Sequence, residues 1–143
     1  MRGNLTRVTD ALTNTTVITY DLLGHKMLLP YSRMRVWQYG YDLNGNLTSQ
    51  RDARGQWLHM QYDALNRLTA KRGGSVTGTL LSEYVYDTVK KGLLSTSKAY
   101  NAEGTVEARN VAYDARGRVT QRQWVVPGAG GGTFRMDYGY DEA

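Results

Sequence analysis

Apolar and polar residues alternate with a period of two along most of this chain. Such alternation predicts β-strands whose two faces differ in character. No segment longer than about ten residues shows the 3.6-residue period of a helix. The chain is therefore expected to be all-β. The residues predicted to share a strand face are Trp37, Tyr39 and Tyr41; Leu58, Met60 and Tyr62; and Phe134, Met136, Tyr138 and Tyr140.

The predicted strands end at a dipeptide, Tyr-Asp, that recurs at intervals of 21, 21, 24, 27 and 27 residues. A fixed period of this length indicates a repeat architecture. We expect one array over residues 1–143, with about six hairpin units beginning at or near residues 1, 20, 41, 62, 86 and 113. The repeated pairs are Tyr20-Asp21, Tyr41-Asp42, Tyr62-Asp63, Tyr86-Asp87, Tyr113-Asp114 and Tyr140-Asp141.

A turn is predicted directly after these pairs. The fourth position after the tyrosine holds Gly24, Gly45, Asn66 or Gly117 in four of the copies. Glycine and asparagine are the residues that most readily accept positive φ, and the aspartate before them can accept hydrogen bonds from turn amides. Gly45→Val and Gly117→Val should therefore destabilise the fold, whereas Asn66→Gly should be neutral or mildly stabilising.

Each unit also carries a second turn near its middle, at 52–55 and 101–104, so that two strands and two turns make a unit of about 21 residues. The longer units gain their extra residues in Gly-rich stretches at 73–78 and 127–132. Insertions confined to one class of loop are expected where neighbouring strands must keep their register.

Composition excludes several classes of protein. The chain has no cysteine, so it has no disulfide framework and no thiolate metal site. No stretch is apolar for the 18 or so residues that a membrane helix requires, and no membrane insertion is expected. Its 18 basic residues outnumber the 13 acidic ones but are scattered, which favours solvated strand faces over a nucleic-acid-binding stripe.

The sequence contains few candidate residues for a metal, cofactor or catalytic site. His25 and His59 lie 34 residues apart without a nearby ligand set, so no metal, cofactor or catalytic site is predicted. The recurring aspartates are better explained by turn capping than by acid–base catalysis. The aromatic rows either pack across strands, which we favour, or form a stacking surface for sugars or single-stranded nucleic acid.

The repeated block resembles the YD repeats of the Rhs family, which have the loose consensus Tyr-Asp-x-x-Gly-Arg-Leu-Thr. Residues 41–48 and 113–120 follow it closely, and 62–69 is a third copy. The block at 86–93 delays its glycine by two positions, and the block at 20–27 lacks the Leu-Thr pair. Irregular strand pairing is therefore expected at the Tyr20 and Tyr86 hairpins.

The resemblance implies an architecture and a role. In this family, which includes the toxin-complex B and C components and the animal teneurins, antiparallel hairpins form a long curved sheet that spirals into a hollow shell. In the bacterial members the shell encloses a toxic C-terminal polypeptide, and in teneurins it supports cell adhesion. The Asp-Pro-x-Gly region that ends the autoproteolytic core of such shells has no counterpart here, since the chain has no Asp-Pro.

We therefore expect a non-enzymatic scaffold segment of a toxin-encapsulating shell, in a parent protein that is secreted or on the cell surface and bacterial rather than animal. Because residues 3–6 match 45–48 without their Tyr-Asp pair, the chain is expected to be a fragment of a larger protein. Its expected partners are the rest of the shell and an enclosed toxin, with self-association through open sheet edges. The alternative is an extracellular carbohydrate-binding or adhesion module that uses the aromatic rows to engage glycans.

Overall fold

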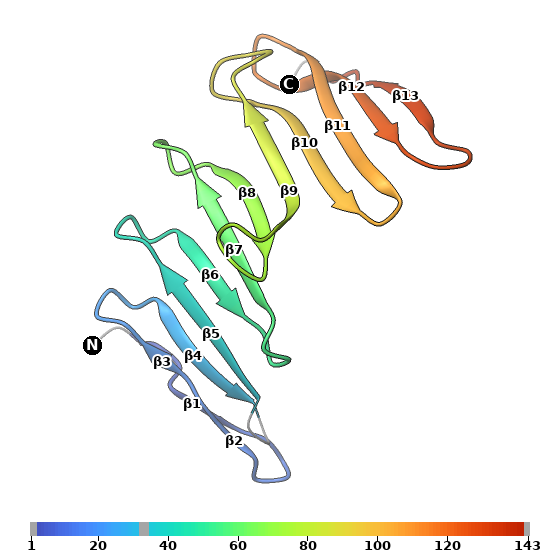
Figure 1. Ribbon diagram of the computed structural model, residues 1–143. Helices are drawn as coiled ribbons and strands as arrows, with labels where there is room; N and C mark the ends of the chain where they lie inside the picture. The colour runs from blue at the N-terminus through green and yellow to red at the C-terminus, as the bar shows by residue number, and fades with distance from the viewer. Residues whose placement is uncertain (1–2, 32–34, 142–143) are drawn as a thin grey trace. The chain divides into compact units, whose positions relative to one another are not determined.

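The computed structural model describes residues 3–31 and 35–141, and residues 1–2, 32–34 and 142–143 of the predicted array lie outside them. The described residues form strands and turns and no helix, which confirms the all-β prediction (Figure 1). The strands are β1 (Arg7–Thr9), β2 (Thr15–Val17), β3 (Thr19–Tyr20), β4 (Lys26–Tyr31), β5 (Arg35–Tyr41), β6 (Leu47–Arg51), β7 (Trp57–Tyr62), β8 (Leu68–Gly73), β9 (Thr79–Tyr86), β10 (Leu94–Asn101), β11 (Gly104–Tyr113), β12 (Val119–Val126) and β13 (Gly132–Asp137).

Strands that are neighbours in the sequence are also neighbours in the sheet. The order runs from β3 to β13 without a crossover, and β1 and β2 form a separate two-stranded sheet. Pairings such as β5 with β6 and β10 with β11 are antiparallel, as the hairpin prediction requires. The Gly-rich insertions at 74–78 and 127–131 fall in the loops between β8 and β9 and between β12 and β13, which keeps strand register intact.

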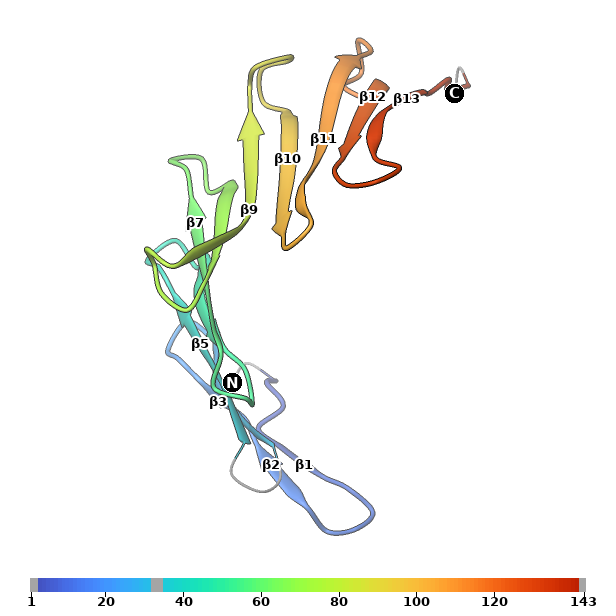
Figure 2. The ribbon, with the colours of Figure 1, turned by 45° about the vertical axis from the view of Figure 1, so that its right-hand side comes forward.

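The chain divides into two compact units. The first comprises Met1–Leu68 with Arg72–Thr79, and the second comprises Thr69–Lys71 with Leu80–Ala143. Within each unit the ribbon is one strand thick, as the turned view shows (Figure 2).

In the first unit the two faces of the sheet differ in chemistry. Residues opposite one another across paired strands share a face. The row Leu28, Gln38, Arg51 and Trp57 is built from three such pairings and defines what we call the polar face. The alternate residues of β5 and β7 lie on the opposite face, which we call the tyrosine face. They are Trp37, Tyr39, Leu58, Met60 and Tyr62.

In the second unit the two faces of the sheet also carry different side chains. On one face Ala108 lies opposite Trp124, which in turn lies opposite Phe134. On the other face Lys98 lies between Glu83 and Glu107, and its Nζ contacts Glu83 Oε2 at 3.2 Å. Period-two alternation therefore places the Trp124–Phe134 pair and the Lys98–Glu83 ion pair on opposite faces of a single sheet.

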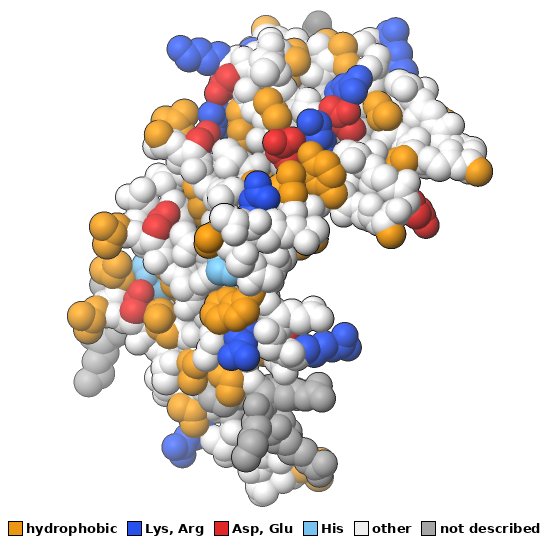
Figure 3. Space-filling model, in the orientation of Figure 1, with side chains coloured by type: hydrophobic (Ala, Val, Ile, Leu, Met, Phe, Trp, Pro, Cys, Tyr) orange, Lys and Arg blue, Asp and Glu red, His pale blue; other side chains and the backbone are white. Residues whose placement is uncertain are grey.

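Few hydrophobic side chains are buried. Among the described residues only Ile18, Met60, Ala70 and Ala108 are hydrophobic and buried, at 8–9% exposure. The chain exposes 10075 Å², whereas a compact protein of 16.1 kDa exposes roughly 7,400 Å². Hydrophobic side chains are accordingly visible at the surface (Figure 3). A single sheet has no second layer against which to close a core.

A β-bulge follows the tyrosine of the repeat in the hairpins at Tyr20, Tyr41, Tyr86 and Tyr113. In the β5–β6 pair, Gly40 lies opposite Ser49 but Tyr41 lies opposite Leu47, so Thr48 is the extra residue. The sequence predicted irregular pairing at the Tyr20 and Tyr86 hairpins, and it occurs there, but the shift at Tyr41 shows that it belongs to regular copies too. The extra residues are Met27, Thr48, Ser95 and Thr120.

Candidate functional site: the Tyr-Asp turns

Five of the six tyrosines of the repeat occupy the last position of a strand: Tyr20, Tyr41, Tyr62, Tyr86 and Tyr113. The sixth, Tyr140, does not, because β13 ends at Asp137. The prediction that the strand continues to Tyr140 is therefore wrong. Gly139 interrupts the segment, and a residue without a side chain contributes no cross-strand packing.

The turn after Tyr41 has a defined geometry. Asp42 N donates to Asn46 O (3.0 Å), and Gly45 N donates to Asp42 O (3.1 Å). Gly45 has a φ of +83°. This is the type I turn completed by a left-handed residue that is common in short hairpins. The same bonds recur in the turns that begin at Asp21, Asp63 and Asp114, where Gly24, Asn66 and Gly117 have φ of +90°, +60° and +82°.

The aspartate side chain caps this turn from within. Asp42 Oδ1 accepts hydrogen bonds from the backbone N of Asn44 (3.0 Å) and of Asn46 (2.8 Å). Its Oδ2 accepts another from Asn46 Nδ2 (2.9 Å). The Asn46 side-chain bond, together with these amides, lowers the pKa of Asp42, because each bond favours the charged carboxylate.

The residue four positions after the aspartate completes the turn, and sequence reasoning missed it. Its side chain donates to the other carboxylate oxygen whether it is asparagine, histidine or arginine. Arg118 Nε lies 2.6 Å from Asp114 Oδ2, and this bond lowers the pKa of Asp114. The remaining pairs are His25 Nδ1 with Asp21 Oδ2 (2.8 Å) and Arg67 Nε with Asp63 Oδ2 (2.7 Å).

Two of these side chains, those of His25 and Arg118, also contact the tyrosine of a following hairpin. The His25 ring stacks on Tyr41 with centroids 4.8 Å apart. The Arg118 guanidinium lies over the Tyr140 ring at 4.3 Å from its centroid, within the range of a cation–π contact. One residue therefore links its own turn to the next repeat.

The tyrosine hydroxyls make a second link between repeats. Tyr62 Oη donates to the backbone O of Leu47 at 2.9 Å. Leu47 lies two positions after the left-handed Gly45, in the preceding hairpin. Each such bond ties a tyrosine of the repeat to the backbone of an earlier hairpin. The equivalent bonds are Tyr20 Oη to Leu5 O (2.9 Å), Tyr140 Oη to Val119 O (2.7 Å) and Tyr113 Oη to Leu94 O.

Two neighbouring turn tips of the first unit are joined through Asn66. Its Oδ1 accepts hydrogen bonds from Asn44 Nδ2 (3.0 Å) and Asn46 Nδ2 (2.7 Å). Asn66 therefore supplies a side-chain acceptor as well as tolerance of positive φ. A glycine at this position could provide only the second.

The Tyr86-Asp87 turn is built differently. Asp87 itself has a φ of +68°, and its Oδ1 accepts from Gly92 N at 2.6 Å. The amides of Thr88 and Val89 instead donate to Ser95 Oγ, at 3.0 and 3.2 Å. Ser95 is 1% exposed, so the delayed glycine is accommodated by a buried hydroxyl that takes over the capping role.

Turns of the same geometry occur without a tyrosine. Asp52 Oδ1 accepts from the amides of Arg54 and Gln56, and Gly55 has a φ of +82°. Asp10 repeats the arrangement with Thr13 at a φ of +65°, a turn that sequence reasoning missed. The Asp-to-Asn spacing of four between Asp10 and Asn14 is the signal that could have found it.

The side chains of the Tyr-Asp turns cap the turns and link neighbouring hairpins through noncovalent contacts. In the described part of the chain, no group of three or more metal-binding side chains lies together, and no helix is able to cross a membrane. Asp141 is exposed, and the turn that would follow it falls outside residues 3–141. The bonds found here serve to hold one hairpin against the next.

Comparison with known proteins identifies the fold. No curated protein sequence matches the chain. Three crystal structures of TcdB2-TccC3 share its architecture: the form without the hypervariable C-terminal region (TM-score 0.64, 16% identity, 92% of this chain and 8% of that chain), TcdB2-TccC3-Cdc42 (0.63, 15%, 92% and 8%) and TcdB2-TccC3-TEV (0.60, 15%, 89% and 6%). The present chain thus spans less than a tenth of theirs. The family profile described as Teneurin YD-shell matches residues 2–143, and the protein therefore belongs to that family.

Proposed function

We propose that this chain is a segment of the wall of a closed YD shell that encloses a polypeptide of the same protein, such as a C-terminal toxin. The observation that carries the proposal is the single layer: four buried hydrophobic residues among those described cannot make a self-sufficient core. Such a sheet needs other polypeptide to cover the apolar side chains on at least one of its faces. An enclosed polypeptide inside a shell would provide that cover.

The links between repeats support a wall rather than a binding or catalytic module. Tyrosine hydroxyls and turn side chains are used in bonds from hairpin to hairpin, as in Tyr62 with Leu47 and Asn46 with Asn66. A structure extended by identical links can grow by adding repeats. We further propose that the parent protein is secreted or displayed at the cell surface, as is implied for such shells.

The two faces of the second unit fit a boundary between two environments. The face with Trp124 and Phe134 carries large aromatic side chains, together with Arg122 bonded to Asn110, and the face with Glu83, Lys98 and Glu107 carries ion pairs. In a closed wall these faces would meet different surroundings, one the interior and the other the exterior.

Photo-crosslinking in the full-length protein tests enclosure. A benzophenone amino acid replaces Trp124 in one variant and Gln123, its neighbour on the opposite face, in the other. We expect one of the two positions, and not both, to crosslink to another segment of the same polypeptide. Crosslinks from both faces, or from neither, would overturn the proposal.

A further inference from the structure

Three neighbouring turns of the first unit carry leucine side chains that project into solvent. Leu22 is 99% exposed and Leu43 is 101% exposed, and Leu23 and Leu65 are 60% and 69% exposed. All four lie in the two positions that follow the aspartate of a Tyr-Asp turn. Such positions favour small or polar residues, so these leucines, which we call the leucine row, are not explained by the turn itself.

The three turns lie along one edge of the sheet. They join β3 to β4, β5 to β6 and β7 to β8, and alternate connections of sequential antiparallel strands fall on the same edge. Their tips are therefore about 10 Å apart, which is two strand spacings. The turns follow one another along the ribbon (Figure 1), and hydrophobic side chains project from that edge (Figure 3).

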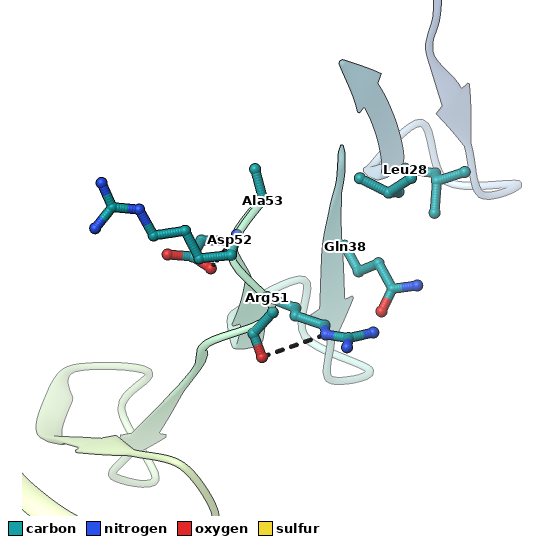
Figure 4. A pocket seen from close by; sticks show the side chains of 8 residues that line it. Leu28, Gln38, Arg51, Asp52 and Ala53 are labelled. Atoms are coloured by element: carbon teal, nitrogen blue, oxygen red, sulfur yellow. Dashed lines mark hydrogen bonds between the residues drawn. The ribbon is translucent and has the colours of Figure 1, made fainter. Parts of the chain in front are cut away.

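Other turns of the same geometry have no leucine at the tip. The β6–β7 turn, on the opposite edge, has Ala53 and Arg54 in the corresponding positions and borders a hollow of about 520 Å³ beside Arg51 (Figure 4). The Tyr113-Asp114 turn of the second unit has Ala115 and Arg116. The leucine row is therefore a local feature of one edge of the first unit.

The first unit also carries most of the excess positive charge. It contains nine lysine and arginine residues against five aspartates, whereas the second unit contains nine against eight acidic residues. Two carboxylates of the leucine-bearing turns form ion pairs within their own turn, Asp21 with His25 (2.8 Å) and Asp63 with Arg67 (2.7 Å). The apolar edge thus belongs to a unit that attracts anions.

The turns also bond their own backbone at the tip. The amides of Leu23 and Leu65 each donate to the aspartate Oδ1 of their turn at 2.9 Å, and the amide of Asn44 does so at 3.0 Å. A backbone amide without a partner would make it costly to bring the tip into an apolar medium. These bonds lower that cost.

The form of this edge favours a lipid surface over a protein surface. A specific protein interface needs about 1,000 Å² of closely complementary surface. The edge of a sheet one strand thick would meet a protein only at separate tips. A bilayer admits each leucine separately, and binding to it strengthens with buried apolar area and with attraction between cations and anionic lipids.

We propose that the leucine row docks the first unit on an anionic lipid bilayer. The leucine side chains enter the boundary between headgroups and acyl chains, and the cations of the unit interact with the headgroup phosphates. The contact is peripheral, and no segment needs to cross the bilayer. It does not depend on whether a shell encloses a polypeptide.

Co-sedimentation of the 143-residue chain with vesicles of mixed phosphatidylcholine and phosphatidylglycerol tests the proposal. Vesicles of phosphatidylcholine alone are the matched surface, and we expect them to bind about ten-fold more weakly because the anionic headgroups are absent. Leu43→Ser should weaken binding to the anionic vesicles by about ten-fold, because an inserted leucine is lost.

Leu12→Ser is the matched control. Leu12 is 81% exposed in the turn between β1 and β2, which lies before β2, whereas the first turn of the leucine row lies after β3. Its removal should change binding less than two-fold. An environment-sensitive nitrobenzoxadiazole dye on Leu43→Cys should shift its emission to the blue on anionic vesicles, and the same dye on Leu12→Cys should not.

Unchanged far-UV circular dichroism of Leu43→Ser separates loss of the contact from loss of the fold. No binding of the folded chain to anionic vesicles, unchanged binding by Leu43→Ser, or equal dye shifts at positions 12 and 43 would overturn the proposal. Binding to a thymidine dodecamer as tight as to the vesicles and unaffected by Leu43→Ser would also overturn it, since charge alone would then explain the binding. A dimer abolished by Leu43→Ser, without vesicle binding, would assign the leucine row to a second copy of the chain.

Discussion

At the scale of single residues, one carboxylate organises each regular turn. Asp42 accepts two backbone amides on one oxygen and a side-chain donor on the other. Gly45 supplies the left-handed conformation that brings those donors into range. Neither residue works without the other, because the amides reach the carboxylate only when the chain reverses at positive φ.

Gly45→Ala should destabilise the first unit by roughly 1–2 kcal/mol, the usual penalty for a side chain in the left-handed region. Its Cβ would also lie 3.1 Å from His25 Nε2. Gly139→Ala is the matched control, since Gly139 lacks positive φ and a Cβ there meets nothing within 4 Å. Urea unfolding of both variants measures the difference. Equal midpoints would contradict the role of Gly45.

Lowering the pH should reduce the stability that the Tyr-Asp turns give to the fold. The pKa of Asp114 is lowered in the folded chain by Arg118, so its stabilising effect is complete above its unfolded pKa of about 3.9 and is lost as pH falls through the folded value. Asp114→Asn should therefore lose less stability than the parent chain when the pH is lowered from about 5 to about 2.5.

Urea midpoints measured across that pH range provide the test, with Asp141→Asn as the control. Asp141 is exposed and makes no turn hydrogen bond within residues 3–141. If both variants kept the parent's pH dependence, the carboxylate of Asp114 would not be a stabilising cap.

Part of the turn was predictable from sequence. Gly24, Gly45 and Gly117 stand out because glycine is the residue that positive φ favours. The fourth residue after the aspartate did not stand out, because histidine, asparagine and arginine share only a donor nitrogen. The sequence predicts that Asn66→Gly is neutral or mildly stabilising, but the bonds from Asn44 and Asn46 now lead us to expect a loss of stability.

At the scale of strands, the repeat is a hairpin tied back to its predecessor. Tyr62 ends β7, and its hydroxyl bonds to Leu47 at the start of β6. In the preceding hairpin a bulge at Thr48 lies next to this point, and bulges increase local twist. The Leu-Thr pair of the repeat therefore provides the accepting carbonyl and then the bulge.

Tyr62→Phe should destabilise the first unit by about 0.5–1.5 kcal/mol, because the Leu47 carbonyl loses a partner and the ring is kept. Tyr138→Phe is the control, since the Tyr138 hydroxyl makes only a weak contact with Met136 Sδ (3.4 Å). The free energies of unfolding of the two variants provide the comparison. A Tyr62→Phe variant as stable as the control would show that the hydroxyl link contributes nothing.

The positions of the strands and the residues on each face were predictable from the period-two alternation of the sequence, as in β5 and β7. The bulges after Tyr41 and Tyr113 were not predicted, because the blocks at 41–48 and 113–120 follow the repeat consensus closely. The end of β13 at Asp137 was also missed, since Tyr138 and Tyr140 continue the alternation although the strand does not.

At the scale of the molecule, each unit of the chain is a sheet with two uncovered faces. The strands pair in sequence order, and no second layer packs on them within the described residues. Phe134 is 50% exposed and Met136 is 48% exposed. Large exposed apolar side chains of this kind are typical of a surface that another part of a protein covers.

Cysteine labelling tests this account most directly, because the natural chain has no cysteine. Phe134→Cys and Arg135→Cys place a thiol on opposite faces of β13, since successive residues of a strand alternate. A bulky maleimide should label both variants of the 143-residue chain at similar rates but only one of them in the folded full-length protein. Rapid labelling of both positions in the full-length protein, or protection of either in the isolated chain, would contradict a single-layered wall.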